Sequence, residues 1–131
     1  MRNIGRFIVI DDDELNNTLC RIVITHALGK IDVKTFTRPE VGLDFIASEY
    51  SKVIDETPAV LLLDINMPTM SGWEFLEEFE KLNETIKKQL SIYILSSSVD
   101  ERDRERAGQH EYVKDYIIKP LKIERVLTLN P

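Results

Sequence analysis

Short apolar runs alternate with amphipathic helical segments along almost the whole chain, and this alternation restricts the fold more than any other feature. The predicted strands cover residues 6–10, 32–36, 59–64, 91–96 and 115–119. The predicted helices cover residues 14–28, 40–50, 72–82, 99–109 and 121–129. Alternation with this period indicates an α/β fold, in which a parallel sheet carries helices on both faces.

Several of the predicted helices have local boundary signals. Asp13 is the expected N-cap of the first helix, and Gly29 is its expected stop. Capping boxes are expected at three further helix starts, namely Thr37 with Glu40, Ser71 with Glu74, and Ser98 with Glu101. The helical period gathers apolar residues on one face of the first helix: Leu15, Leu19, Ile22, Val23 and Ala27.

Composition favours one soluble domain, and we expect it to span residues 1–131. The chain is 43% hydrophobic and 31% charged, and its apolar runs are too short to cross a bilayer. The single cysteine, Cys20, excludes an internal disulfide and suits a reducing compartment. A net charge of −6 argues against direct nucleic-acid binding. We therefore expect a cytoplasmic domain without membrane contact.

Polar side chains stand where four of the predicted strands end. Asp11 and Asp12 follow the first strand, Asp64 ends the third, Ser96 the fourth and Lys119 the fifth. Ligands of open parallel sheets bind outside the carboxyl ends of the strands. Each residue alone has an ordinary reading as a cap, a turn residue or a surface charge. Together they predict a site with three carboxylates, one hydroxyl and one ammonium.

Crowded carboxylates raise the free energy of a folded chain unless a cation lies among them. Oxygen ligands without a nearby histidine or thiolate suit a hard divalent cation, Mg²⁺ before Zn²⁺. A carboxylate such as Asp64, with a metal beside it, can attack a phosphoryl group. Lys119 would neutralise charge that builds on the phosphoryl oxygens. The pattern therefore indicates phosphoryl chemistry.

Four segments carry a family resemblance, namely "IVIDDD" (8–13), "LLLDINMPTMSGWEFL" (61–76), "YILSSS" (93–98) and "DYIIKP" (115–120). In this order, and over about residues 7–129, they resemble the receiver domain of bacterial two-component response regulators. The tail of the chain is similar to single-domain receivers of the Bacteroidetes lineage. The resemblance implies a flavodoxin-like, doubly wound (βα)5 three-layer sandwich with strand order 2-1-3-4-5.

The resemblance also implies a role for each acidic residue. Asp64 would be the phosphoacceptor and a metal ligand. Asp12 would bind Mg²⁺ directly and Asp11 chiefly through water, while the backbone carbonyl of Asn66 would complete the protein ligands. Mn²⁺ could replace Mg²⁺ in such a site.

A second set of implied roles concerns the switch. Lys119 would pair with the phosphoryl group, and the Lys119–Pro120 peptide would be cis. Ser96 would be the switch hydroxyl and Tyr116 the aromatic switch that turns inward behind it. Serine stands where the family more often has threonine, and Ser97 stands where alanine is common. The residues two past Asp64 and Ser96, which are Asn66 and Ser98, influence phosphoryl lifetime in this family.

The function implied is a signalling domain that catalyses only its own phosphorylation and dephosphorylation. A sensor histidine kinase or a histidine phosphotransfer protein would be the donor, recognised near Asn16 and Leu19. Phosphorylation would change the surface that an unknown downstream protein binds, which is formed by segments 99–109, 115–119 and 121–129. The chain could also be a receiver cut from a longer protein.

Other functions stay open at this point. One is a constitutive interaction module without phosphorylation. Another is a phosphatase with an aspartate nucleophile, although Asn66 stands where that chemistry wants a second carboxylate. Nucleotide binding is disfavoured because no glycine-rich phosphate loop follows any strand.

The remaining features have structural readings. Cys20 and Trp73 are expected to serve packing, and His26 and His110 to be surface or structural residues. The charged run 100–106, "DERDRER", is expected to be a solvated helix face, with a partner surface as the alternative.

Overall fold

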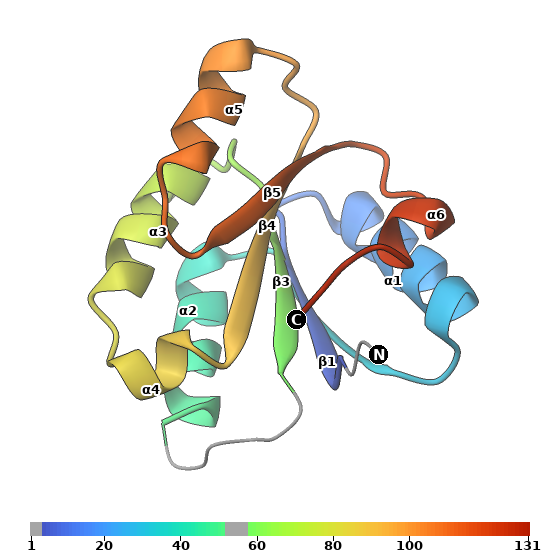
Figure 1. Ribbon diagram of the computed structural model, residues 1–131, viewed down its shortest axis with the longest axis horizontal. Helices are drawn as coiled ribbons and strands as arrows, with labels where there is room; N and C mark the ends of the chain where they lie inside the picture. The colour runs from blue at the N-terminus through green and yellow to red at the C-terminus, as the bar shows by residue number, and fades with distance from the viewer. Residues whose placement is uncertain (1–3, 52–57) are drawn as a thin grey trace.

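The computed structural model describes residues 4–51 and 58–131, which form a three-layer α/β structure (Figure 1). Its five strands make one parallel sheet in the order β2-β1-β3-β4-β5. The strands are β1 (Arg6–Ile10), β2 (Asp32–Phe36), β3 (Ala59–Leu63), β4 (Leu90–Ser96) and β5 (Val113–Ile118). Both the parallel sheet and the strand order are confirmed.

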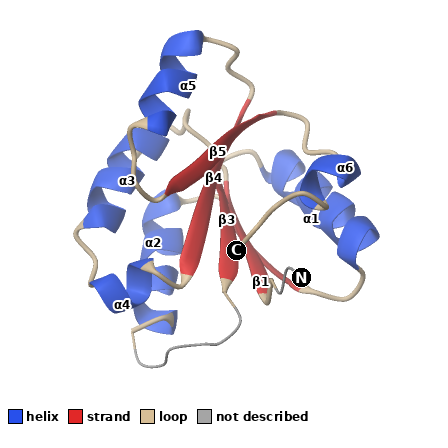
Figure 2. Ribbon diagram, viewed as in Figure 1, coloured by secondary structure: helices blue, strands red, loops and turns tan. Residues whose placement is uncertain are grey.

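Helices cover both faces of the sheet (Figure 2). On one face lie α1 (Glu14–Leu28) and α6 (Ile123–Val126). On the other lie α2 (Pro39–Glu49), α3 (Gly72–Glu80), α4 (Glu84–Lys87) and α5 (Glu101–Gly108). This doubly wound arrangement is the predicted fold class. Among the described residues, no helix is long and apolar enough to cross a membrane.

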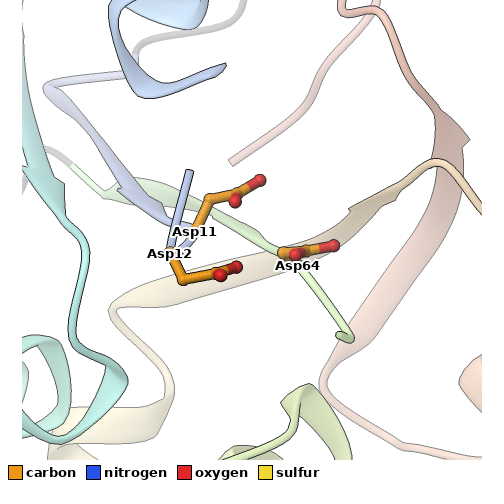
Figure 3. A group of neighbouring side chains, drawn as sticks. All are labelled: Asp11, Asp12 and Asp64. Atoms are coloured by element: carbon orange, nitrogen blue, oxygen red, sulfur yellow. The ribbon is translucent and has the colours of Figure 1, made fainter. Parts of the chain in front are cut away.

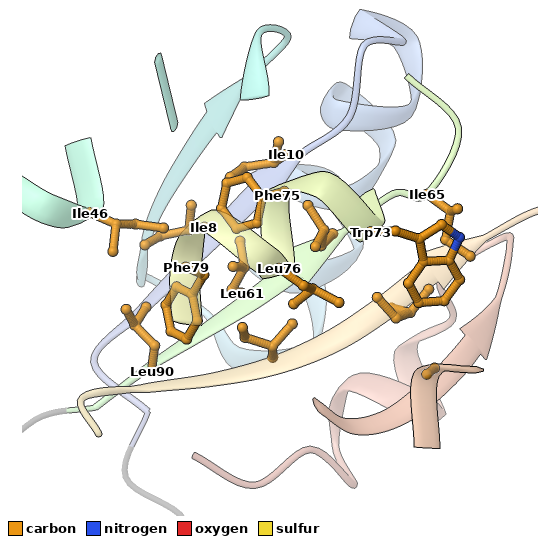
Figure 4. Close-up of a cluster of buried hydrophobic side chains, with 14 of the residues drawn as sticks. Ile8, Ile10, Ile46, Leu61, Ile65, Trp73, Phe75, Leu76, Phe79 and Leu90 are labelled. Atoms are coloured by element: carbon orange, nitrogen blue, oxygen red, sulfur yellow. The ribbon is translucent and has the colours of Figure 1, made fainter. Parts of the chain in front are cut away.

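The central strand β3 is buried on both sides. Leu61 and Leu63 pack in the cluster beneath α2 and α3, whereas Val60 and Leu62 pack in the cluster beneath α1. Figure 4 shows the first cluster, to which α3 contributes Phe75, Leu76 and Phe79. Each large apolar side chain buried in this way contributes about 1.5–3 kcal/mol. The sheet is therefore a rigid base for the residues at its carboxyl edge.

Two of the predicted helix boundaries are confirmed in detail. Asp13 caps α1, since its Oδ1 accepts a hydrogen bond from the Leu15 amide at 3.0 Å. Ser71 and Glu74 form a reciprocal capping box at the start of α3, with distances of 3.1 and 2.9 Å. The phosphoacceptor candidate Asp64 is thus followed, after one loop, by a helix whose start is fixed.

The other two predicted capping boxes are wrong. Helix α2 begins at Pro39 after Arg38, which makes no side-chain capping bond, and the fixed φ of proline starts the helix without help from Thr37. Helix α5 is capped by Asp100, whose Oδ1 accepts from the Arg102 amide at 2.9 Å. Ser98 lies two residues before this cap, and its hydroxyl donates to Asp103 in the first turn of α5 and accepts from the Asp100 amide.

The apolar face predicted for α1 is only partly buried. Val23 and Ala27 pack against the core, but Leu15, Leu19 and Ile22 are 66%, 48% and 58% exposed. The helix instead buries Asn17, Cys20 and Ile24.

Three smaller differences concern the second half of the chain. The short helix α4, capped by Asn83, was not predicted. Strand β5 begins at Val113, two residues before its predicted start, and α6 covers only four of the nine residues predicted as the last helix.

Candidate functional site

The carboxyl edge of the sheet brings the predicted acidic residues together. Asp11 follows β1 and Asp64 follows β3, and these two strands are neighbours. The ladder continues past the strand ends, because the Asp64 amide donates to Ile10 O at 3.0 Å and the Asp11 amide donates to Phe36 O at 3.1 Å. Backbone pairing therefore fixes the positions of both side chains.

Asp11, Asp12 and Asp64 form one carboxylate cluster (Figure 3). One ligand oxygen from each lies within 4.8 Å of the others. Asp11 and Asp64 are buried, at 2% and 6% exposure, while Asp12 is exposed to solvent. The cluster is open on the side of Asp12.

Lys119 reaches the same cluster from the end of β5. Its Nζ lies 2.7 Å from Asp11 Oδ2 and 3.7 Å from Asp64 Oδ1. Its amide donates to Ser96 O at 2.8 Å, which ties the end of β5 to the end of β4. The Lys119–Pro120 peptide is cis, as the resemblance implied. Three carboxylates against one ammonium leave an excess of negative charge.

The electrostatics of Asp64 reflect this excess. Burial, and then the neighbouring charge of Asp11, raise the pKa of Asp64 to about 6, although Lys119 acts in the opposite direction. A divalent cation among the three carboxylates would favour the ionised form. The ligands offered are all oxygens, with no histidine or cysteine in the cluster, and this set fits Mg²⁺.

Asp11 and Asp12 differ in how much of their hydrogen-bonding capacity is used. Asp11 Oδ1 accepts from the Asp13 amide at 2.9 Å, and Asp11 Oδ2 accepts from Asn16 Nδ2 at 2.9 Å as well as from Lys119. In the described part of the chain, the Asp12 carboxylate has no hydrogen bond or ion pair. Asp12 thus keeps both oxygens available to a ligand.

Asn66 lies in the loop between β3 and α3 and is exposed. The loop is closed by a hydrogen bond from the Gly72 amide to Ile65 O at 2.8 Å. A Cβ at Gly72 would lie 2.5 Å from Asp64 O, so the backbone of this loop fits only with glycine there. This contact holds the backbone of Asp64 against the start of α3.

Ser96 ends β4, and Tyr116 lies on the neighbouring strand β5, where it pairs with Ile94, two residues before Ser96. Ser96 is fully buried, and its Oγ accepts from the Ser98 amide at 3.1 Å. Tyr116 is buried too, and its hydroxyl donates to Ser98 O at 2.9 Å. The Arg104 guanidinium lies 5.4 Å from the Tyr116 ring centroid. The Tyr116 side chain is therefore buried, with its hydroxyl bonded to the loop between β4 and α5.

Sequence reasoning missed several supporting residues. Asn16 and Asn17 hold Asp11 from α1, since Asn17 Nδ2 donates to Asp11 O at 2.9 Å and Asn16 bonds the carboxylate. Asp103 accepts a hydrogen bond from Ser98 Oγ at 2.6 Å. The contacts of Asn16 and Asn17 could have been predicted from sequence spacing. These residues are five and six positions after Asp11, on the first turn of the helix that begins beside it.

The residues that were expected to have structural roles lie mostly where they were predicted. Cys20 is buried, and burial raises the pKa of its thiol to about 12. Trp73 is buried; the Arg106 guanidinium lies 4.6 Å from its ring centroid, and the His110 ring stacks on it with centroids 5.9 Å apart. His110 also faces Glu80 Oε1 at 3.4 Å, so it belongs to the contact between α3 and α5.

Comparison with known proteins decides the family. The sequence profile of the response regulator receiver domain matches residues 7–129. The chain belongs to this family. The regulatory protein VanRB of Enterococcus faecalis is 29% identical to it over 120 residues, which cover 92% of this chain and 47% of VanRB. The chain thus spans about half the length of VanRB.

Solved structures support the same conclusion for the receiver. A two-component response regulator from Cytophaga hutchinsonii has a TM-score of 0.84 at 27% identity, covering 96% of this chain and 93% of that one. A response regulator receiver protein from Dyadobacter fermentans has a TM-score of 0.81 at 27% identity, covering 91% and 89%. Both belong to the Bacteroidetes, the lineage that the sequence resembled.

Proposed function

We propose that this receiver domain is a phosphorylation-controlled signalling module in which Asp64 accepts a phosphoryl group. The observation that carries the proposal is the cluster of Asp11, Asp12 and Asp64 around an edge that Lys119 also reaches. The proposed module is a single domain over residues 1–131 and works in the cytoplasm.

In the proposed reaction an oxygen of Asp64 attacks the phosphorus of a phosphohistidine donor. The bond from phosphorus to the donor nitrogen breaks, and its electron pair leaves with the imidazole. The product is an acyl phosphate on Asp64. Lys119, whose Nζ is 3.7 Å from Asp64 Oδ1, stabilises negative charge on the transferred oxygens.

Asp11, Asp12, Asp64 and the backbone carbonyl of Asn66 are the residues that would hold the cation. When bound there, Mg²⁺ or Mn²⁺ supplies positive charge beside the phosphoryl oxygens. Asp12 suits direct ligation because its carboxylate is exposed and unpaired among the described residues. Asp11 suits ligation through water because Lys119, Asn16 and the Asp13 amide already use its oxygens.

The readout follows from the added charge. Phosphorylation brings about −1.5 to −2 charges and strong acceptor oxygens. Ser96 and Lys119 are drawn toward them, and the surface of α5, β5 and α6 responds through Tyr116. Moving a two-state equilibrium from 1:99 to 99:1 takes roughly 5.5 kcal/mol. Two or three charge-assisted hydrogen bonds, at about 1.5–3 kcal/mol each, are enough.

The donor is a sensor histidine kinase or a histidine phosphotransfer protein that docks on α1. The exposed apolar residues Leu15, Leu19 and Ile22 support this, because they lie on the helix that begins beside Asp12. Leu19→Asp should lower phosphoryl transfer from such a donor at least tenfold and leave transfer from acetyl phosphate unchanged. The downstream protein would bind the surface of α5, β5 and α6.

The deciding experiment is intact mass after incubation with Mg²⁺ and acetyl phosphate. Wild type should gain one phosphoryl group, and Asp64→Asn should gain none. Asp44→Asn is the matched control, because Asp44 is an exposed aspartate on α2, and it should behave as wild type. Chelation of Mg²⁺ should abolish the addition. A wild type that stays unmodified with acetyl phosphate and with phosphohistidine donors would contradict the proposal and favour a constitutive interaction module.

A further inference from the structure

Ser98 is the junction between three parts of the switch region. Its amide donates to Ser96 Oγ at 3.1 Å, and its carbonyl accepts from the Tyr116 hydroxyl at 2.9 Å. Its own hydroxyl donates to Asp103 Oδ2 at 2.6 Å and accepts from the Asp100 amide at 3.2 Å. One residue therefore links the end of β4, the ring on β5 and the first turn of α5.

The hydrogen bond from the Ser98 amide determines whether the Ser96 hydroxyl can donate its proton to a ligand. Ser96 Oγ accepts this bond and, within residues 4–51 and 58–131, donates none. Its proton is therefore available to an acceptor such as a phosphoryl oxygen. The orientation of the Ser96 hydroxyl depends on the position of the Ser98 amide, from which it accepts. The position of that amide depends in turn on the contacts that hold Ser98.

Asp103 is the side chain that holds Ser98 from the helix. The distance of 2.6 Å is typical of an O–H group that donates to a carboxylate, which is a strong class of hydrogen bond. Asp103 lies in the first turn of α5, where the positive end of the helix dipole also stabilises its charge.

We propose that Asp103 is a positioning residue for Ser96. It anchors Ser98, so that the Ser96 hydroxyl is aligned before the phosphoryl group arrives. The inference rests on the proposed function, because it concerns the phosphoryl transfer to Asp64.

The other acidic side chains of the charged run do not share this role. Glu101 and Glu105 are exposed and make no hydrogen bond or ion pair among the described residues. Asp100 caps the helix and pairs with Arg102. Of the four acidic side chains in the run 100–106, Asp103 is the one that hydrogen-bonds Ser98 among the described residues.

The role can be measured in the transfer from acetyl phosphate. An oxygen of Asp64 bonds to phosphorus, the bond from phosphorus to the acetate oxygen breaks, and acetate leaves with the electron pair. Ser96 then donates its hydrogen bond to a phosphoryl oxygen that becomes more negative. Losing the alignment of this donor should slow transfer about three- to tenfold, in line with the loss of one hydrogen bond.

The test compares four variants by the rate of phosphoryl gain in intact mass, over a range of acetyl phosphate concentrations. Asp103→Ala should be slowed about three- to tenfold, while Asp103→Asn, which keeps an acceptor oxygen, should recover to within about twofold of wild type. Glu105→Ala removes the same charge from the same helix and should match wild type. Asp100→Ala weakens the helix start and should change the melting temperature more than the rate.

Three outcomes would overturn the inference. One is an Asp103→Ala rate equal to that of Glu105→Ala. Another is an Asp103→Asn rate as low as that of Asp103→Ala. The third is an equal slowing by Asp100→Ala, since the effect would then come from helix stability alone. A phosphorylated wild type with any of these results overturns this inference and leaves the proposed function standing, whereas an unmodified wild type overturns both.

Discussion

The turns after β1 and β4 have the same hydrogen-bonding pattern but carry different functional groups. In each, the side chain at the strand end accepts the amide two residues later: Asp11 from Asp13 at 2.9 Å, and Ser96 from Ser98 at 3.1 Å. An aspartate then caps the following helix, Asp13 for α1 and Asp100 for α5. The first turn presents a buried carboxylate, and the second presents a neutral hydroxyl.

The difference in charge goes with a difference in how each turn is held. Asp11 is held by Lys119, which directly follows β5, and by Asn16 of α1. Among the residues that the structure describes, Ser96 has no charged partner, and its turn is held to α5 through Ser98 and Asp103. We infer that the first turn is the fixed part of the site and that the second is the part that responds.

The largest effect should come from the fixed turn. Asp11→Ala removes the partner that holds the Lys119 ammonium at 2.7 Å. A misplaced group of this kind can lower a reaction rate about 100-fold, and we expect that loss in phosphoryl gain from acetyl phosphate. Intact mass against time gives the rate. Asp44→Asn serves again as the exposed control, and a loss below about fivefold for Asp11→Ala would show that Lys119 needs no such anchor.

The charge of the fixed turn should also reduce stability when no cation is present. The pKa of Asp64 is raised to about 6, so between about pH 4 and 6 the folded chain binds more protons than the unfolded chain. The stabilisation from this group is present below about pH 4 and is lost as the pH rises through about 6. Relative to Asp64→Asn, wild type should lose about 2 kcal/mol of unfolding free energy over that range.

Urea unfolding in a chelating buffer, at several pH values, measures this difference. Adding Mg²⁺ at pH 7 should raise the stability of wild type more than that of Asp64→Asn. A constant difference between the two proteins from pH 4 to 7 would mean that Asp64 titrates as an ordinary exposed carboxyl.

The responsive turn should show a smaller effect on the reaction and a larger one on the readout. Ser96→Ala removes one hydrogen-bond donor to the phosphoryl group and the acceptor of the Ser98 amide. The variant should still be phosphorylated, about tenfold more slowly than wild type. Amide hydrogen exchange in α5, compared with and without phosphorylation, should change less than it does in wild type. An equal change in the two phosphorylated proteins would exclude Ser96 from the switch.

The sequence was a good guide to the sheet and to the residues at its edge, for a physical reason. Strands without polar alternation, such as residues 59–63, must be covered on both faces, and alternating helices supply that cover. Once the sheet is parallel, the side chains after its strands meet at one edge. Asp11, Asp64 and Lys119 meet there through backbone pairing in the strand order that the family resemblance, and not periodicity, implied.

The sequence was a poorer guide where one side chain had a choice of partners. Serine is a common N-cap residue, so Ser98 was a reasonable candidate for the cap of α5. Its hydroxyl donates to Asp103 instead, and Asp100 caps the helix. On α1 the helical period could not tell a buried apolar residue from an exposed one, so Leu15 and Leu19 were grouped with Val23. The charged run gave no sign that Asp103 differs from Glu105.

The smallest effects should separate the two caps. Replacing a capping aspartate by alanine costs about 1 kcal/mol on average. Asp13→Ala should show about that loss in global stability, because α1 is 15 residues long and carries Cys20 and Ile24 into the core. Asp100→Ala should show about half as much, because α5 buries only Ala107 and can open without unfolding the sheet. Urea unfolding gives the global values, and hydrogen exchange in α5 should speed up in the second variant alone. Equal global losses would mean that α5 unfolds only with the whole domain, and the turn before it would then be as fixed as the turn before α1.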